Sequence, residues 1–169
     1  MKFWVYLSLC FLLVPLQTTV LGRASTTLVE PDLILVAVCL IGLLTDELEG
    51  ALMGILLGFI QDLFSAGVAF PNLVTKGVLG ILAGLIGRQV VQVSSTVVAM
   101  AVVLLSALSG LAFLYLARGH ALWDAVLAVP TLLLPQALLD AILAVAVFWG
   151  VRQVAARYYS FHPSVLRED

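Results

Sequence analysis

Charged residues and breaks rich in proline or glycine divide the chain into six mainly apolar segments. In order, these segments cover residues 3–22, 33–45, 50–64, 73–87, 96–117 and 131–151. A helix needs about 20 apolar residues to cross the hydrocarbon core of a bilayer, and fewer where the bilayer thins. The second, third and fourth segments are short and need flanking residues to reach this length, unless they are tilted or broken. The pattern predicts a six-span transmembrane domain over residues 1–151 and a short cytoplasmic C-terminal tail over residues 152–169.

Composition supports the membrane interpretation. Of the 169 residues, 63% are hydrophobic and 11% are charged, and the mean hydropathy is +1.17. Soluble domains are roughly 45–50% apolar and about 25% charged. Because helices satisfy their own backbone hydrogen bonds in lipid, we expect an all-α integral membrane protein that contacts membrane lipid. The net charge of −2 supplies no basic surface for nucleic acid.

The first segment has two interpretations, a transmembrane span or a cleaved signal peptide. Lys2, an apolar run to about residue 16 and the sequence "TTVLGRAS" resemble a secretory signal. If the segment is a span and the N-terminus is cytoplasmic, five basic residues lie inside and three outside. This agrees with the positive-inside rule and places both termini in the cytoplasm.

Small residues recur every fourth position on the third and fourth segments. Gly50, Gly54 and Gly58 form one such stripe, and Gly80 and Gly84 form another. Residues at this spacing share a helix face, so another backbone can approach closely. We expect the third segment to pack on the fourth, or on a helix of a partner.

Ionisable residues at the ends of segments need partners. Asp32 follows a proline at the start of the second segment, where helix capping explains it. Asp62 stands at the C-terminal end of the third segment, where the helix dipole disfavours an anion. We therefore expect Asp62 to pair with Lys76 or with a nearby helix N-terminus. Asp46, Glu47 and Glu49 are expected in a solvated cytoplasmic loop, with Arg88 as a possible neighbour.

Asp140 is the deepest ionisable residue, near the middle of the last segment. Gln136 precedes it by four residues and therefore shares its helix face. Two interpretations stay open. One is an interhelical hydrogen bond, and the other is a functional contact such as a proton relay or an acid facing a partner.

Residues that could support catalysis or metal binding are sparse. Cys10 and Cys39 lie in apolar runs, and His120 and His162 lie in polar connections without companions at metal spacing. The sequence contains no motif of an intramembrane aspartyl protease, a phosphoalcohol transferase or a P-loop nucleotidase. We expect no enzyme activity, no cofactor and no metal.

Four stretches resemble the bacterial rod shape-determining protein MreD family. They are "PDLILV", "GALMGILLGFIQDLFSAG", "PNLVTKGVLGILAGLIG" and "LLLPQALLDAILAVAVFWGVRQ". The positions that match the family pattern are Gly54, Gly58, Gln61, Asp62 and Asn72. Two departures are the sequence "AFPN", where the family usually has a glycine before the asparagine, and Asp140, where it often has an asparagine.

The resemblance implies a non-enzymatic scaffold of the elongation (rod) complex in the bacterial inner membrane. Such a protein binds MreC directly and, through it, joins RodA, the elongation-specific penicillin-binding transpeptidase and MreB. It maintains cell shape by supporting lateral peptidoglycan synthesis, and it keeps its first span. Asp62, Asn72 and Lys76 would then form a structural or docking site at the outer mouth of the bundle.

Two other functions are considered. The MreD family is similar in architecture to the substrate-binding components of energy-coupling-factor vitamin transporters. That function predicts a polar, aromatic-lined pocket open to the outside, whereas the predicted outer loops are short. A proton-coupled carrier based on Asp140 has no internal repeat or second mid-span charge to support it.

Overall fold

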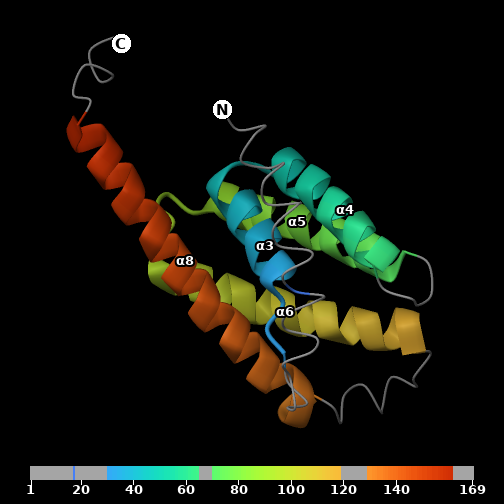
Figure 1. Ribbon diagram of the computed structural model, residues 1–169. Coiled ribbons are helices and arrows are strands. Elements are labelled where there is room, and N and C mark those ends of the chain that lie inside the picture. The colour runs from blue at the N-terminus through green and yellow to red at the C-terminus, as the bar shows by residue number, and fades with distance from the viewer. Residues whose placement is uncertain (1–16, 18–29, 65–69, 119–128, 162–169) are drawn as a thin grey trace.

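The computed structural model describes residues 17, 30–64, 70–118 and 129–161. This part of the chain is all-helical, which confirms the predicted secondary-structure class. Its elements are α3 (Leu33–Leu44), α4 (Glu47–Phe64), α5 (Pro71–Gln89), α6 (Ser95–Arg118), the π-helical turn η2 (Val129–Leu133) and α8 (Leu134–Phe161) (Figure 1).

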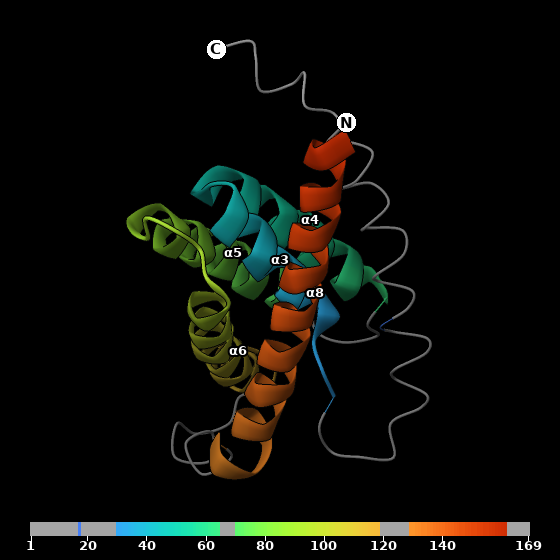
Figure 2. The ribbon, with the colours of Figure 1, turned by 90° about the vertical axis from the view of Figure 1, so that its left-hand side faces the viewer.

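The helices form two neighbouring pairs that α3 connects. Helices α4 and α5 lie side by side, and α6 and α8 cross below and beside them (Figure 1). Helix α3 contacts all four of these helices. The C-terminal end of α8 extends past the rest of the bundle (Figure 2). The short helix α3 is therefore the centre of the fold.

The apolar core surrounds α3. Leu35 and Cys39 of α3 pack in one cluster with residues of α5, α6 and α8, including Ala83, Val102 and Phe148. A smaller cluster joins the opposite side of α3 to α4 through Val38, Met53 and Leu57. All of these side chains are buried, so burial of apolar surface from every helix holds α3 in the middle.

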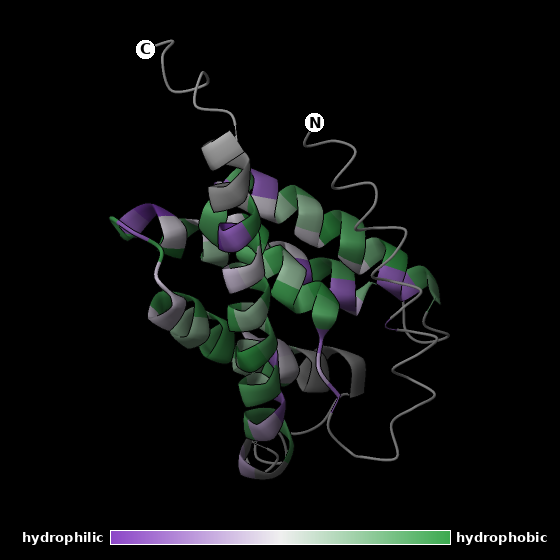
Figure 3. Ribbon diagram, turned by 60° about the vertical axis from the view of Figure 1, so that its left-hand side comes forward, coloured by the Kyte–Doolittle hydropathy of each residue, from purple (hydrophilic) through white to green (hydrophobic). Residues whose placement is uncertain are grey.

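Two of the described helices are long and apolar enough to cross a membrane. The qualifying stretches are Ser95–Ala112 in α6 and Leu134–Val154 in α8, and α3 is a shorter apolar helix of 12 residues. Helix α4 carries Glu47, Glu49 and Asp62, and α5 carries two basic residues. The predicted first span lies outside the described residues. Most of the length of the helices is nevertheless hydrophobic (Figure 3), and large apolar side chains such as Met100 and Ile142 are 70% and 66% exposed.

The predicted loop before the third segment was wrong. The acidic residues Glu47 and Glu49 lie in the first turn of α4, not in a loop, and the Asp46 carboxylate accepts a hydrogen bond from the Glu49 N–H at 2.7 Å. An aspartate cap followed by acids in the first turn favours a helix start. Helix α8 continues beyond residue 151 to Phe161, into the first part of the predicted tail, and its stretch that is apolar enough to cross a membrane ends at Val154.

Candidate functional site, a buried polar junction

The glycine stripe of α4 lies directly against the backbone of α5. A methyl group added at Gly50, Gly54 or Gly58 would overlap carbonyl oxygens of α5, those of Gly80, Lys76 and Asn72 respectively. From the other side, Gly80 and Gly84 lie against the backbones of Gly50 and Glu47. The third segment was expected to pack on the fourth segment or on a helix of a partner. In the structure it packs on the fourth segment, which forms α5. This close approach brings the side chains of α5 next to α3 and α4.

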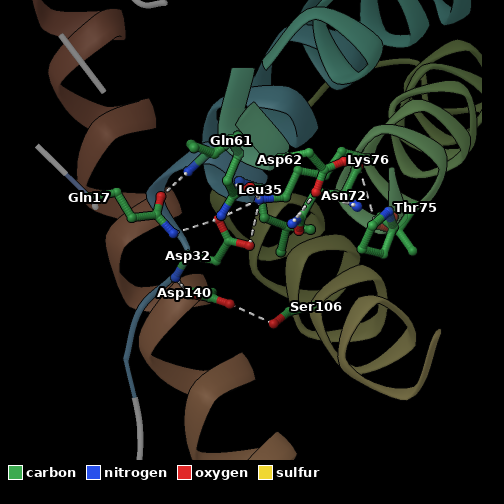
Figure 4. A network of polar contacts seen from close by, with 12 residues as sticks. Gln17, Asp32, Leu35, Gln61, Asp62, Asn72, Thr75, Lys76, Ser106 and Asp140 are labelled. Carbon is green, nitrogen blue, oxygen red and sulfur yellow. Dashed lines mark hydrogen bonds and ion pairs between the residues drawn. The ribbon is translucent and has the colours of Figure 1, made fainter. Parts of the chain in front are cut away.

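Lys76 is brought inside the bundle by this packing, and its side chain is 1% exposed. Its ammonium group lies 2.9 and 3.0 Å from the two carboxylate oxygens of Asp32 at the start of α3. It also donates to the side-chain oxygen of Gln61 on α4 (Figure 4). The predicted pairing of Lys76 with Asp62 is therefore wrong, because the ammonium points toward α3 and is held by Asp32.

Asp32 does more than cap α3. Its carboxylate accepts from the Leu35 N–H at 3.0 Å, which is the capping bond that the sequence predicts. It also accepts from the Gln17 amide at 3.1 Å and forms the ion pair with Lys76. The prediction that Asp32 serves only as a helix cap was therefore incomplete. A cap needs one acceptor oxygen, whereas this carboxylate binds three donors, the Leu35 N–H, the Gln17 amide and the Lys76 ammonium.

Asp140 is fully buried and connects three helices. One oxygen accepts from the Ser106 hydroxyl of α6 at 2.5 Å, and the other accepts from the backbone N–H of Asp32 at 2.7 Å. Among the described residues, these two supply its hydrogen bonds, and the half-buried Gln136 does not. The geometry is that of an interhelical hydrogen bond, one of the two interpretations that the sequence left open.

These residues form one connected group, which we call the polar junction. Its members are Gln17, Asp32, Gln61, Lys76, Ser106 and Asp140. Among the described residues, no buried side-chain nitrogen or oxygen lacks a hydrogen-bond partner, and no three acidic, histidine or cysteine side chains gather at metal-binding spacing. The junction therefore uses its polar groups to connect helices.

Asp62 forms a separate contact at the start of α5. Its carboxylate accepts from the Asn72 N–H at 3.2 Å, from the Asn72 side-chain amide at 2.8 Å and from the Leu73 N–H at 2.9 Å. The helix N-cap position is occupied by Phe70, which has no side-chain acceptor and lies in the left-handed region at φ 76°. Asp62 thus caps α5 from the neighbouring helix, which is the second of its two expected partners.

This arrangement predicts the result of a charge swap. We expect Asp62→Ala to lower the free energy of unfolding by about 0.5–2 kcal/mol, the usual cost of a lost cap. The double variant Asp62→Lys/Lys76→Asp should be less stable than either single change, because it loses both the cap of α5 and the ion pair with Asp32, whereas each single change loses one of them. Unfolding in mixed micelles, followed by circular dichroism, measures both effects. Recovery of wild-type stability in the double variant would contradict the assigned pairs.

Sequence reasoning missed two members of the junction. Ser106 was overlooked because one hydroxyl within a long apolar helix is common, and only its position opposite Asp140 makes it notable. Gln17 lies in the first apolar segment, where it was the only amide, and it binds both Asp32 and the Ile34 N–H. An uncharged polar residue in an apolar segment was the available signal in both cases.

Comparison with known proteins leaves the residues and their geometry as the basis for assigning a function. No family model, no curated protein sequence and no solved structure matches this chain. The contacts of the polar junction and the packing of α4 on α5 are therefore the observations from which we argue.

Proposed function

We propose that this chain is a non-enzymatic, multi-pass scaffold of the bacterial inner membrane, of the MreD type. In this role it binds MreC and, through MreC, joins RodA, the elongation-specific transpeptidase and MreB in lateral peptidoglycan synthesis. Two of the MreD-like stretches quoted above contribute to the packed helices, since residues 50–64 of "GALMGILLGFIQDLFSAG" lie in α4 and "PNLVTKGVLGILAGLIG" lies in α5.

The proposal rests on one observation: each charged side chain of the polar junction binds other groups of the protein itself. Asp32 and Lys76 form an ion pair. The Asp140 carboxylate accepts hydrogen bonds from the Ser106 hydroxyl and from the backbone N–H of Asp32 at the start of α3. A carrier or an enzyme needs polar groups that are available to a substrate. A scaffold instead needs helices held in fixed relative positions, which buried, fully satisfied polar contacts provide.

The vitamin-transporter alternative receives no support from the groove between α5 and α6. This groove has a volume of about 630 Å³, and its lining is almost entirely aliphatic. A vitamin site needs convergent polar groups and aromatic side chains to orient its ligand. We therefore do not propose that function.

The proposed topology places the α5 cap on the outer side of the membrane and Arg88 and Arg152 on the cytoplasmic side. Asp62 and Asn72 then lie where the main domain of an MreC-like partner would be. Phe70 is 49% exposed beside them and stacks on Phe59, with 6.2 Å between ring centroids. An exposed aromatic residue next to a rigid cap is suited to contact a partner.

Depletion of this protein in a rod-shaped bacterial host tests the proposal. We expect depleted cells to become round, because lateral wall synthesis loses a component that connects its members. MreC should also no longer co-purify with the rest of the complex. Re-expression of the wild-type chain is the control and should restore both. Depleted cells that keep their rod shape would contradict the proposal.

A further inference from the structure

Helix α8 leaves the bundle before the helix ends. Phe148, 2% exposed in the main apolar core, is the last buried residue of α8 among those whose side chains the structure describes, and residues 149–154 are all exposed. A methyl group added at Gly150 would meet no other atom within 4 Å. The helix nevertheless continues to Phe161, past the other helices (Figure 2). Residues 149–161, which we call the α8 extension, are therefore helical beyond the point where the core ends.

The length of α8 exceeds the thickness of the hydrocarbon core of a bilayer. Its 28 residues span about 42 Å at the helical rise per residue. The hydrocarbon core is about 30 Å thick, and the bilayer with its headgroups is about 40–45 Å thick. The usual tilt of about 20° shortens the span of the helix only slightly. Because the stretch of α8 that is apolar enough to cross a membrane ends at Val154, the residues after it reach the headgroup layer in a membrane-embedded chain.

The composition of the α8 extension suits this layer. The sequence has no aspartate or glutamate between Asp140 and Glu168. Tryptophan and tyrosine are enriched at membrane–water interfaces, and a short helix without packing partners is marginal in water. The basic and interfacial aromatic residues of the extension are Trp149, Arg152, Arg157, Tyr158 and Tyr159. The extension is therefore expected to lie at the membrane surface and to be positively charged there.

Arg152 is exposed and has its positive charge available. Its guanidinium lies over the ring of Phe148, with 5.7 Å between the guanidinium carbon and the ring centroid. Arg88 pairs with Glu47, whereas no acidic side chain of the described residues pairs with Arg152. A guanidinium has five N–H donors in a planar fork that suits phosphate oxygens, and contact with a ring face does not use them. An exposed cation without an acidic partner favours an anionic ligand.

From these features we propose that the α8 extension crosses the cytoplasmic headgroup layer, where Arg152 and Arg157 bind phosphate groups of anionic phospholipids. An acidic protein could supply similar anions, but the length of α8 places both arginines at the level of the headgroups. The proposal rests on the membrane location and topology proposed above and does not depend on binding of MreC. Loss of the MreC complex and loss of lipid preference are separate measurements, so failure of one proposal is distinguishable from failure of the other.

Lipid binding by the purified, full-length protein tests this proposal. Native mass spectrometry would compare phosphatidylglycerol with phosphatidylcholine of the same acyl chains, and thermal unfolding in detergent would be followed with each lipid and with sodium phosphate alone. We expect phosphatidylglycerol to bind at least about fivefold more tightly than phosphatidylcholine, the usual effect of one basic residue near an anionic membrane surface. Sodium phosphate should leave the midpoint of unfolding unchanged. Equal binding of the two lipids, or full stabilisation by phosphate, would overturn the proposal.

Matched variants, each checked for folding by circular dichroism, locate the site on α8. Arg152→Gln should weaken phosphatidylglycerol binding about fivefold, whereas Arg152→Lys keeps the charge and should retain most of the binding. Arg152→Gln/Arg157→Gln should abolish the preference for phosphatidylglycerol. Arg88→Gln removes an arginine whose charge Glu47 already offsets, and it should leave binding nearly unchanged. Equal losses in Arg152→Gln and Arg88→Gln would contradict the assignment to α8.

Photo-crosslinking in cells distinguishes the bilayer from a protein as the partner of the extension. A photoreactive residue would replace Gln153, which is exposed next to Arg152. We expect crosslinks to phospholipid. A crosslink to an acidic protein in place of lipid would overturn the proposal, because the extension would then be a docking site for that protein.

Discussion

Replacing Lys76 with methionine is expected to lower the free energy of unfolding by about 3–5 kcal/mol, the usual cost of removing one partner of a buried ion pair. The substitution keeps most of the side-chain volume but leaves the Asp32 carboxylate without its counter-charge. Since Lys76 is 1% exposed and Asp32 is 17% exposed, water can replace the ammonium only in part. Gln61 loses a hydrogen-bond donor in the same change.

Two further variants separate this effect from a general loss of charge. Asp32→Asn/Lys76→Met removes both charges and should recover part of the stability, because no uncompensated ion is then buried. Arg88→Met breaks the exposed pair with Glu47 and should cost no more than about 1 kcal/mol. Unfolding of all variants would be followed by circular dichroism in mixed micelles. Equal losses for Lys76→Met and Arg88→Met would show that the junction contributes no more than a surface pair.

Replacing Gly54 with alanine is the second change for which we expect a large effect. The added methyl group would overlap the carbonyl of Lys76 on α5, so the two helices must move apart. Overpacking of this kind typically costs about 1–3 kcal/mol. Separation of α4 from α5 would also move Lys76 away from Gln61, which adds to the loss.

Gly150 supplies the matched control for this change. It lies in α8, and nothing lies within 4 Å of a methyl group added there. Because alanine is a better helix former than glycine, Gly150→Ala should raise stability by up to about 1 kcal/mol. The two variants make the same chemical change and should shift the midpoint of unfolding in opposite directions. Shifts of the same sign would contradict the close α4–α5 packing.

The contact between α4 and α5 could be predicted from the sequence because it depends on the spacing of glycines within one helix. Gly50, Gly54 and Gly58 fall on one face whatever surrounds them, and a smooth face requires a close neighbour. The capping of α5 by Asp62 was anticipated for a similar reason, since an anion at a helix C-terminus needs compensation. In both cases a local pattern restricted the choice of partner.

The ion pair between Asp32 and Lys76 could not be read from the sequence in the same way. The two residues are 44 positions apart, and the choice of Asp32 over Asp62 depends on where α3 lies between the helix pairs. Helix α8 gives a related example. The change to charged and aromatic residues after residue 151 was interpreted as the end of a span, whereas the helix itself continues to Phe161, because a helix does not have to end where its apolar stretch ends.

Direct binding of MreC by the purified chain is the measurement that tests the proposed scaffold role most directly. The tagged wild-type chain would be co-expressed with full-length MreC from the same host and isolated in mild detergent. An unrelated multi-pass membrane protein with the same tag serves as the control. The proposed role predicts a stable complex with MreC that the control does not form. A folded chain that recovers no more MreC than the control would contradict it.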